Sequence, residues 1–335
     1  MNKWEKEVQE SLLESEEEAL NELQKQYNKA LNDINQKIKQ FESDIDFLDQ
    51  ALESTMDDAA REILLSQKRS RVYQKQFQEA LQGQINGILE KMHSDNYSTI
   101  EGYLKNTYED AYLGSMYDLA NQGIPVITPI NQAAATKAIL TDSKISTSLY
   151  DALGVDVGNL KKTIAQTVSR GIVSALPYQE IANQISRISQ APLHRAMTIT
   201  RTEGHRIQQQ ATENQSRDAM DHGADLVKKW DAYLDHKTRE SHRNVDGEIR
   251  EMDEPFSNGL MYPGDPNGSA GEVINCRCAR LNLPRWAVDD GFSKIDGFSG
   301  EILHFKSQKD YEEFKKNYWS KENQEYMKYV QNLDV

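Results

Sequence analysis

The chain has little cysteine, a deficit of positive charge and no long apolar run. Two cysteines occur among 335 residues, and 39 Lys and Arg face 53 Asp and Glu, so the formal net charge is -14. The cysteines are one residue apart, so a bridge between them would close a small strained ring, and we expect no disulfide framework. No run of about 18 apolar residues is present, which predicts no membrane span.

The net negative charge limits which partners the protein can bind, and its first residues indicate where it is made. A protein with a pI near 5.1 repels phosphate over most of its surface, so contact with DNA requires a local basic patch. The first residues, Met1 to Glu5, lack the apolar core of a signal peptide, so we expect a protein made in the cytoplasm.

The composition predicts a mainly α protein with a small β element, an α+β class with about two domains. A hydrophobic content of 38% and a mean hydropathy of -0.75 are low for one large globule, so part of the chain should be extended helix. We expect an extended helical region at 1–122 and a domain at 123–285. That domain divides into a helical part, 123–222, and a β-containing part, 223–285, and an extension with a terminal helix follows at 286–335.

The first 92 residues carry the spacing of a coiled coil or helical hairpin. From Tyr27 onward the apolar residues recur at alternating steps of four and three, and a break is expected between Ser54 and Asp58. The two helices either pack on each other or present one apolar stripe to a partner protein. The apolar positions are Leu20, Leu23, Tyr27, Leu31, Ile34, Ile38, Phe41, Ile45, Leu48 and Leu52, then Val72, Tyr73, Phe77, Leu81, Ile85, Ile88 and Met92.

The middle of the chain predicts a series of helices that glycine and proline separate. A helix at 97–121 should end before Gly123 and Pro125, and Pro192 suits the first turn of a long helix that Gly223 ends. The other predicted helices cover residues 131–140, 146–153, 157–170 and 178–185.

After Gly223 the pattern changes to that of a small β element. Residues 226–235 alternate as a strand does, and 276–283 are predicted to return beside them. Between these strands we expect helical turns at 238–245, a turn at Asp246-Gly247 and a long loop at 253–272. The last region predicts a strand at 301–306 and a helix at 310–330. The aromatic face of that helix packs on its own domain or on a neighbouring subunit; its members are Tyr311, Phe314, Tyr318, Tyr326 and Tyr329.

His242, Cys276 and Cys278 are the candidate metal ligands. Imidazole and paired thiolates suit zinc, and Asp235, His236 or Asp246 lies near enough in sequence to supply a fourth ligand. The alternative is that the two cysteines are small strand residues with His242 hydrogen-bonded nearby.

The same region contains the residue types of a metal-dependent nuclease. An ion and a histidine would activate water there. Nothing in the spacing enforces such a site, and the chain has neither a Gly-rich phosphate loop nor a Gly-x-Ser-x-Gly elbow. We therefore expect no enzymatic activity. The residues of this alternative are His236, His242, Asp235, Asp246 and Asn275.

Basic residues cluster in the second half and offer a patch for phosphates. They form either a surface for sequence-independent contact with double-stranded DNA or a mixed solvated surface. Six are the candidate DNA contacts: Lys228, Lys229, Arg239, Arg243, Arg277 and Arg280, with Lys237 and Arg250 nearby. Arg201 and Glu203 are neighbours on a predicted helix, so we expect each to hold a different element in place.

Together these residues resemble the phage head morphogenesis family of tailed bacteriophages, the Mu F-like minor head proteins. The resemblance covers roughly residues 150–285. The matching stretches are Tyr178-Gln179-Glu180-Ile181-Ala182, Arg195-Ala196, Arg201-Thr202-Glu203, Trp230 with Asp235, Thr238-Arg239, His242, Asp246-Gly247 and Asn275-Cys276-Arg277-Cys278.

The resemblance implies a minor capsid protein rather than an enzyme. Such proteins enter the procapsid in few copies and associate with the portal, and some members are thought to touch packaged or ejected DNA. It therefore implies a place inside the virion head after synthesis in the bacterial cytoplasm, with the portal, scaffold or major capsid protein as partner. Other members complete a zinc set with Cys-x-x-Cys and His-Pro. Here Arg239 and His242 stand at the first pair and Val273-Ile274 at the second.

Overall fold

A computed structural model describes residues 3–69, 71–140, 149–173, 176, 178–288 and 291–331. The chain forms two compact units, each built from separated stretches of sequence. The first unit contains Met1–Glu18, Glu101–Thr147 and Thr198–Val335, and the second contains Ala19–Ile100 and Ser148–Met197. These units differ from the three consecutive regions expected from the sequence, because the residues of three long helices are shared between both. No described helix is long and apolar enough to cross a membrane.

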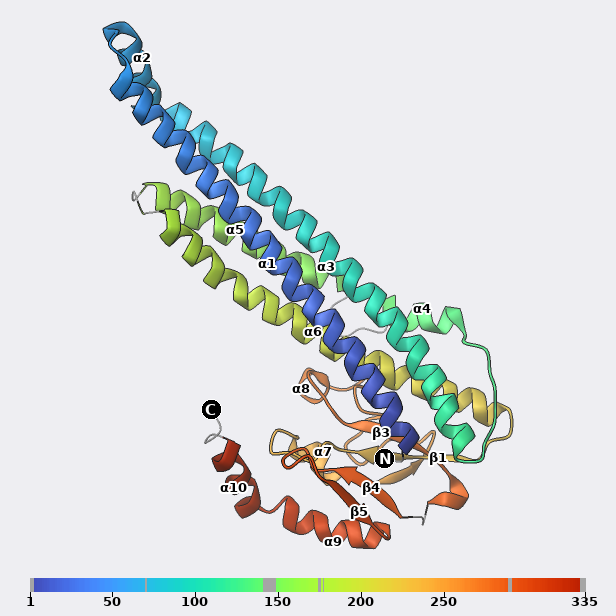
Figure 1. Cartoon of the computed structure of the whole chain (residues 1–335). Helices are drawn as coiled ribbons and strands as arrows, with labels where there is room; N and C mark the ends of the chain where they lie inside the picture. Colours follow the sequence, from blue (N-terminus) through green and yellow to red (C-terminus); the bar gives the residue numbers. More distant parts are fainter. Residues whose placement is uncertain are drawn as a thin grey trace. The chain divides into compact units, whose positions relative to one another are not determined.

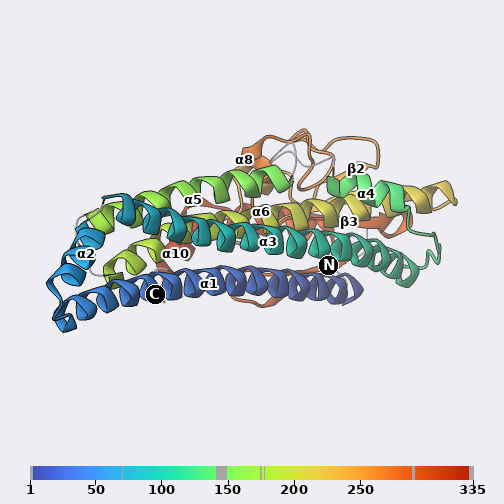
Figure 2. The same cartoon turned by 90° about the horizontal axis from the view of Figure 1, so that it is seen from above.

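The second unit is helical. It takes its residues from α1 (Lys3–Ser54), α2 (Asp58–Arg69), α3 (Arg71–Asn121), α5 (Leu149–Val173) and α6 (Tyr178–Asp221). In this unit α1 and α3 lie side by side and run antiparallel (Figures 1 and 2). The predicted hairpin and its break after Ser54 are confirmed. The heptad positions Leu20, Leu23, Tyr27, Ile34, Ile38, Leu52, Leu81, Ile85 and Met92 are buried. The side chains of Phe41, Ile45, Leu48, Val72, Tyr73 and Phe77 lie outside the described residues.

Several predicted helices join into longer ones. The expected break near residues 92–97 is wrong, because no glycine or proline interrupts α3 there. Pro192 lies inside α6 rather than at a helix start. The segments expected at 146–153 and 157–170 form the single helix α5, and residues 146–148 lie outside the described ones.

A glycine inside α5 allows close packing against a neighbouring helix. Its low helix propensity alone does not predict this role. A Cβ on Gly171 would lie 2.5 Å from Ile181 Cγ1 on α6, and one on Gly154 would lie 3.6 Å from His93 Nε2 on α3. Gly171 therefore lets α6 approach α5 closely, whereas a Cβ at Gly154 would make an ordinary van der Waals contact with His93.

The first unit contains a three-stranded antiparallel sheet in the order β2-β1-β3. The predicted pairing of the first and last strands is confirmed, with Lys229 opposite Leu281 and Trp230 opposite Arg280. The other edge strand, β2, was not predicted because it is three residues long. The bounds are Leu226–Asp231 for β1, Ile249–Glu251 for β2 and Ala279–Pro284 for β3.

Short helices and turns surround this sheet. The predicted segments at 131–140 and 238–245 appear as α4 (Gln132–Leu140) and α7 (Glu240–Asn244). The long loop holds α8 (Ala270–Val273), and a 3₁₀ turn, η1 (Arg285–Ala287), follows β3. Gly123, Gly223 and Gly247 have φ angles of 92°, 96° and 82°, which confirms the predicted stops and the Asp246-Gly247 turn.

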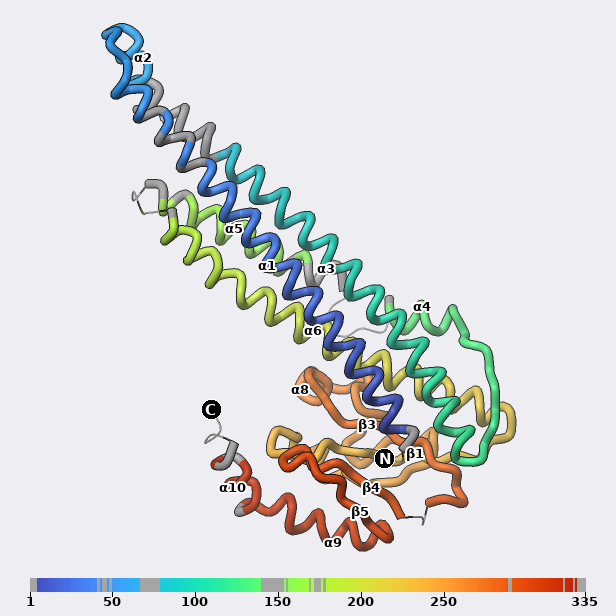
Figure 3. The backbone as a smooth tube through the Cα atoms, viewed as in Figure 1, coloured from blue at the N-terminus to red at the C-terminus, as the bar shows by residue number. Residues whose placement is uncertain are grey.

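The C-terminal region forms a hairpin and two helices. Strands β4 (Phe292–Ile295) and β5 (Ile302–Phe305) pair antiparallel, and α9 (Gln308–Tyr318) lies against β5 (Figure 3). The single helix expected at 310–330 is interrupted after Tyr318 and continues as α10 (Lys321–Gln331). Tyr311 and Tyr318 are buried in their own unit, whereas Tyr326 and Tyr329 are exposed.

Candidate functional site

Trp230 of β1 is the centre of the apolar core next to the candidate site. Its side chain is fully buried, and its ring meets those of Phe256 and His242 edge-on, with centroids 5.1 Å apart in each pair. Cys276 and Cys278 belong to the same buried cluster. The histidine and the two thiols therefore lie at the edge of a dry core, and solvent does not separate them.

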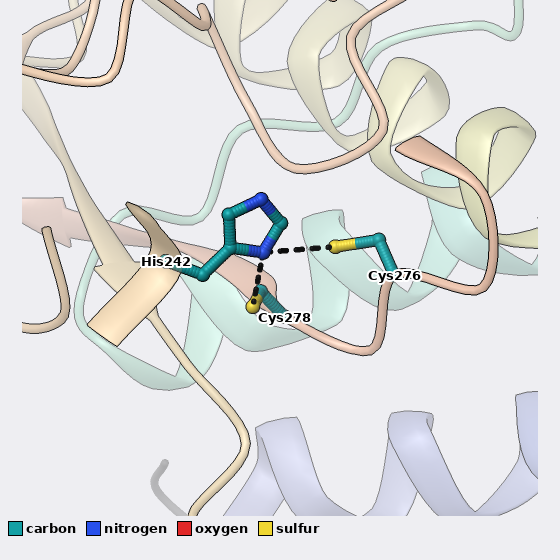
Figure 4. Close-up of side chains that lie close together, drawn as sticks. All are labelled: His242, Cys276 and Cys278. Carbon is teal, nitrogen blue, oxygen red and sulfur yellow. Dashed lines mark hydrogen bonds between the residues drawn. The ribbon is translucent and has the colours of Figure 1, made fainter. Parts of the chain in front are cut away.

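His242 faces both thiols through one ring nitrogen (Figure 4). Nδ1 lies 3.3 Å from Cys278 Sγ and 3.7 Å from Cys276 Sγ, and all three ligand atoms lie within 4.8 Å of one another. A tetrahedral zinc ion with ordinary bond lengths holds N and S ligands about 3.6 Å apart. The predicted set is thus brought together at distances that suit one zinc ion.

A carboxylate on α8 lies next to the imidazole nitrogen that does not face the thiols. His242 Nε2 is 2.8 Å from Glu272 Oε2, and the Ser241 hydroxyl donates to the same oxygen at 2.9 Å. Metal-binding histidines usually have such a group behind the ring, and it fixes which nitrogen faces the metal. Sequence reasoning missed Glu272, although its place four residues before Cys276 was a usable signal.

The two thiols influence each other's protonation. The hydrogen bond from the Cys278 side chain lowers the pKa of Cys276, while burial raises the pKa of Cys278 well above its usual value. Cys276 therefore loses its proton before Cys278 does. A thiolate next to an imidazole nitrogen is a suitable starting point for binding a soft divalent cation.

Two of the three proposed fourth ligands, Asp235 and Asp246, are bonded elsewhere. Asp235 accepts both arms of the Arg277 guanidinium, and Asp246 accepts the Ala232 amide at 2.8 Å and the Lys294 ammonium at 2.7 Å. The imidazole of His236 is different: its buried Nδ1 has no hydrogen-bond partner among the described residues, but His236 does not belong to the group that can hold a metal. Among the described residues, the cluster that can hold a metal contains His242, Cys276 and Cys278 alone.

Asn275 shapes the turn that presents the two thiols. Its φ angle is 52°, a left-handed conformation that asparagine tolerates better than most residues. Its backbone amide donates a hydrogen bond to Thr202 Oγ1 on α6 at 3.1 Å. Asn275 therefore contributes to the cluster through its backbone, which sets the turn before Cys276.

Of the two charged neighbours on α6, only Arg201 binds another element directly in the described part of the chain, because the partner of Glu203 lies on α6 itself. Arg201 Nε lies 3.5 Å from Glu16 Oε1 on α1, and Glu203 pairs with Arg206 at 2.8 Å. Arg206 also donates to the carbonyl of Ala138 on α4. These contacts tie α6 to neighbouring helices within the first unit.

Three of the six expected DNA contacts are buried. Lys228 donates to the carbonyls of Met252 and Met261, and burial lowers its pKa to about 8. Lys229 lies with its ammonium 3.3 Å from the Phe292 ring centroid, and Arg280 pairs with Glu213 inside the unit. Burial prevents these three side chains from reaching a phosphate at the surface, so the six residues do not form one exposed patch.

The other three remain at least partly accessible. Arg277 is 41% exposed, and Arg239 and Arg243 are half-buried. Their guanidinium groups also bond the protein: Arg239 donates to the Ile274 carbonyl and Arg243 to that of His236. Their contact with DNA stays a prediction.

Known proteins match the chain over this region. A family model described as Phage Mu protein F like protein matches residues 162–281. The NAD(+)--arginine ADP-ribosyltransferase EFV of Enterococcus faecalis is 28% identical over 243 residues, 69% of this chain and 46% of that protein. The Minor head protein GP7 of Bacillus phage SPP1 is 28% identical over 225 residues, 63% of this chain and 67% of that protein. The chain thus spans less than half of the enterococcal protein. No solved structure gives a significant match.

The matched region includes α6, the β2-β1-β3 sheet as far as Leu281 and the buried cluster of His242, Cys276 and Cys278. The resemblance expected from the sequence is confirmed by the family model and by the phage head protein: residues 162–281 of this chain match the Mu F-like family.

Proposed function

We propose that the chain is a minor head protein of a tailed bacteriophage, which acts in procapsid assembly near the portal and remains inside the virion head. The match of residues 162–281 to the Mu F-like family carries this proposal, and the name of the SPP1 relative supports it. The geometry agrees, since residues that carry the resemblance build a packed scaffold. Thr202, Trp230, Asp235 and Asp246 bond or pack within the first unit.

The role that we propose is not enzymatic. Asp235 and Asp246, the acids of the nuclease alternative, are bonded to Arg277 and Lys294, so neither is available to hold a metal or activate water. The enterococcal relative carries the name of an ADP-ribosyltransferase, but this chain spans 46% of its length. Purified chain incubated with DNA and Mg²⁺, Mn²⁺ or Zn²⁺, or with NAD⁺ and an arginine-rich acceptor, should give neither cleavage nor transfer. Turnover in either assay would overturn this part.

The helical second unit is the part that we assign to contact with the portal, scaffold or major capsid protein. Large apolar side chains are exposed at the end of its hairpin: Phe47 and Ile63 are 69% and 61% exposed, and Met56 is fully exposed. Apolar groups gathered at one end of a helical hairpin suit a protein interface.

We propose that His242, Cys276 and Cys278 hold one zinc ion. The donor set is soft, the distances fit, and Glu272 lies behind the imidazole. The ion would cross-link α7 to the segment after α8, so its role would be structural. A fourth position would remain for water or for a side chain of an assembly partner.

The decisive experiment compares virions made with and without this chain. Mass spectrometry of purified particles should find the chain in the head, in few copies. Particles made without it should differ in composition or infectivity. Complementation with a variant carrying Phe47→Ser, Met56→Ser and Ile63→Ser should fail to restore incorporation. The exposed lysine changes Lys29→Ser, Lys91→Ser and Lys105→Ser serve as the control. Indistinguishable particles in composition and infectivity would reject the proposal.

A further inference from the structure

The residues that carry His242 form a loop whose two ends contact the C-terminal region. We call residues 232–247, which include α7, the His242 loop, and residues 292–319, which include β4, β5 and α9, the C-terminal strap. The strap lies beyond the segment that matches the Mu F-like family, which ends at residue 281. Both segments belong to the first unit.

The first end of the His242 loop is held at Leu234. Its carbonyl accepts the Tyr318 hydroxyl at 2.6 Å and the Gly297 amide at 2.9 Å. On the loop itself, the Arg243 guanidinium lies over the Trp319 ring, 4.9 Å from its centroid. Three strap residues therefore fix the beginning of the loop and the helix that bears His242.

The second end is held at Asp246 and Gly247. Lys294 and Tyr311 donate to the two carboxylate oxygens of Asp246, and the Lys315 ammonium donates to its backbone carbonyl. Gln308 donates to the Gly247 carbonyl at 3.1 Å. A Cβ on Gly247 would lie 2.6 Å from Gln308 Nε2, so the strap packs directly on this turn.

Lys294 on β4 supplies the positive charge that two buried carboxylates of the family-matched segment require. Its ammonium lies 2.8 Å from Asp231 Oδ1 and 2.7 Å from Asp246 Oδ1, and all three side chains are buried. Two carboxylates in a dry interior need a cation, and removing it leaves uncompensated charge. Both acids lie in the family-matched segment, whereas the lysine lies in the strap.

We propose that the C-terminal strap is a latch for the metal-ligand cluster: it holds the His242 loop shut and thereby keeps His242 over Cys276 and Cys278. When the strap detaches, the loop loses its fixed points on both sides, the imidazole moves away and the thiols become accessible. The latch rests on contacts within the chain and requires neither bound zinc nor a role in the phage head. Its failure would therefore leave the proposed function untouched.

The two thiols, the only cysteines of the chain, report on the latch directly. The full-length chain, freed of metal with a chelator, is reacted with 5,5′-dithiobis(2-nitrobenzoate) under native conditions. Lys294→Met should label about tenfold faster or more than the wild type, because labelling follows the free energy of local opening. Lys309→Met, at an exposed position of α9 elsewhere in the strap, should label at the wild-type rate.

Two further variants keep the test decisive where Lys294→Met fails to fold. Tyr318→Phe removes one hydrogen bond to Leu234 and leaves the charges intact, so labelling should accelerate by a smaller factor with the helical circular dichroism unchanged. Combining Lys294→Met with Asp231→Asn and Asp246→Asn removes the uncompensated charge, so it should slow labelling relative to Lys294→Met alone. Wild-type labelling rates in folded Lys294→Met, or in Tyr318→Phe where Lys294→Met does not fold, would overturn the latch.

Discussion

The guanidinium of Arg277 binds both carboxylate oxygens of Asp235, with nitrogen–oxygen distances of 2.6 and 2.9 Å. Arg277 stands between the two cysteines, and Asp235 precedes α7, which carries His242. Asp235 also accepts from the amide and the hydroxyl of Thr238. This pair therefore joins the thiol segment to the loop of the histidine, which explains why an arginine separates the cysteines.

We predict that Arg277→Gln lowers the free energy of unfolding by about 1 kcal/mol at pH 7, because a bidentate pair is lost but the arginine is partly solvated. Burial raises the pKa of Asp235, but the hydrogen bonds and charge of Arg277 outweigh it and hold that pKa below its usual value. Such a carboxylate stabilises the fold above the unfolded pKa near 4 and loses this contribution as the pH falls. Urea unfolding at pH 7 and pH 3 should show the difference shrinking. An equal difference in unfolding free energy at both pH values would contradict this prediction.

The sequence predicted those elements that depend on periodicity and turn chemistry. Apolar steps through Tyr27, Ile34 and Ile38 gave the hairpin, and the alternation around Trp230 gave the central strand. His242, Cys276 and Cys278 could be grouped because few residue types hold zinc. Local signals of this kind do not depend on distant contacts.

The remainder depends on tertiary contacts that no local pattern records. Gly171 looks like a helix breaker, but it is a contact point for Ile181. Lys228 and Arg280 look like surface cations, but each is bonded inside the unit. Glu272 gains a role only because the fold brings α8 to His242.

Zinc content provides a direct test of the cluster. Purified chain should contain one zinc per molecule by elemental analysis, and a chelator should lower its thermal midpoint, because ligands that bind the folded state stabilise it. Cys276→Ser combined with Cys278→Ser should abolish the zinc, whereas His304→Ala on β5 should not change it. Wild-type protein without stoichiometric zinc would remove the assignment.

DNA binding should depend on the accessible arginines. Replacing Arg239 and Arg243 with glutamine should weaken binding to double-stranded DNA and lower the salt slope by about 2, since each phosphate contact contributes about 0.9. Arg170→Gln with Arg187→Gln removes the same charge from exposed positions in the second unit and should have a smaller effect. Gel shifts at several salt concentrations measure this. Equal effects of both pairs would indicate net charge rather than a local site.

Replacing each of two glycines on α5 with alanine should change the stability of the chain in opposite directions. Gly158 has open space around it, so Gly158→Ala should stabilise the chain by about 0.5–1 kcal/mol through helix propensity. At Gly171 the new methyl group would overlap Ile181, so Gly171→Ala should destabilise by about 1–3 kcal/mol. Urea midpoints measure both, and stabilisation by both would show that Ile181 moves aside freely.

Lys229 should reduce stability at neutral pH. Its side chain is 5% exposed, its ammonium lies over Phe292, and no hydrogen bond to it is present among the described residues. Burial lowers its pKa to about 8, against about 10.4 in an unfolded chain. Between these values the unfolded chain binds more protons, so this group makes the fold more stable as the pH rises from 8 to 10.

Lys229→Met should therefore raise the free energy of unfolding at pH 7 by about 2 kcal/mol, because the methionine fills the same space without a buried charge. The advantage over the wild type should shrink as the pH rises towards 10, since the unfolded wild-type lysine then also loses its proton. Comparing the two proteins cancels the titration of the tyrosines that they share. Guanidinium unfolding at pH 7, 8.5 and 10 measures the difference. A variant less stable than the wild type at pH 7 would mean that the contact of the ammonium with Phe292 outweighs its desolvation.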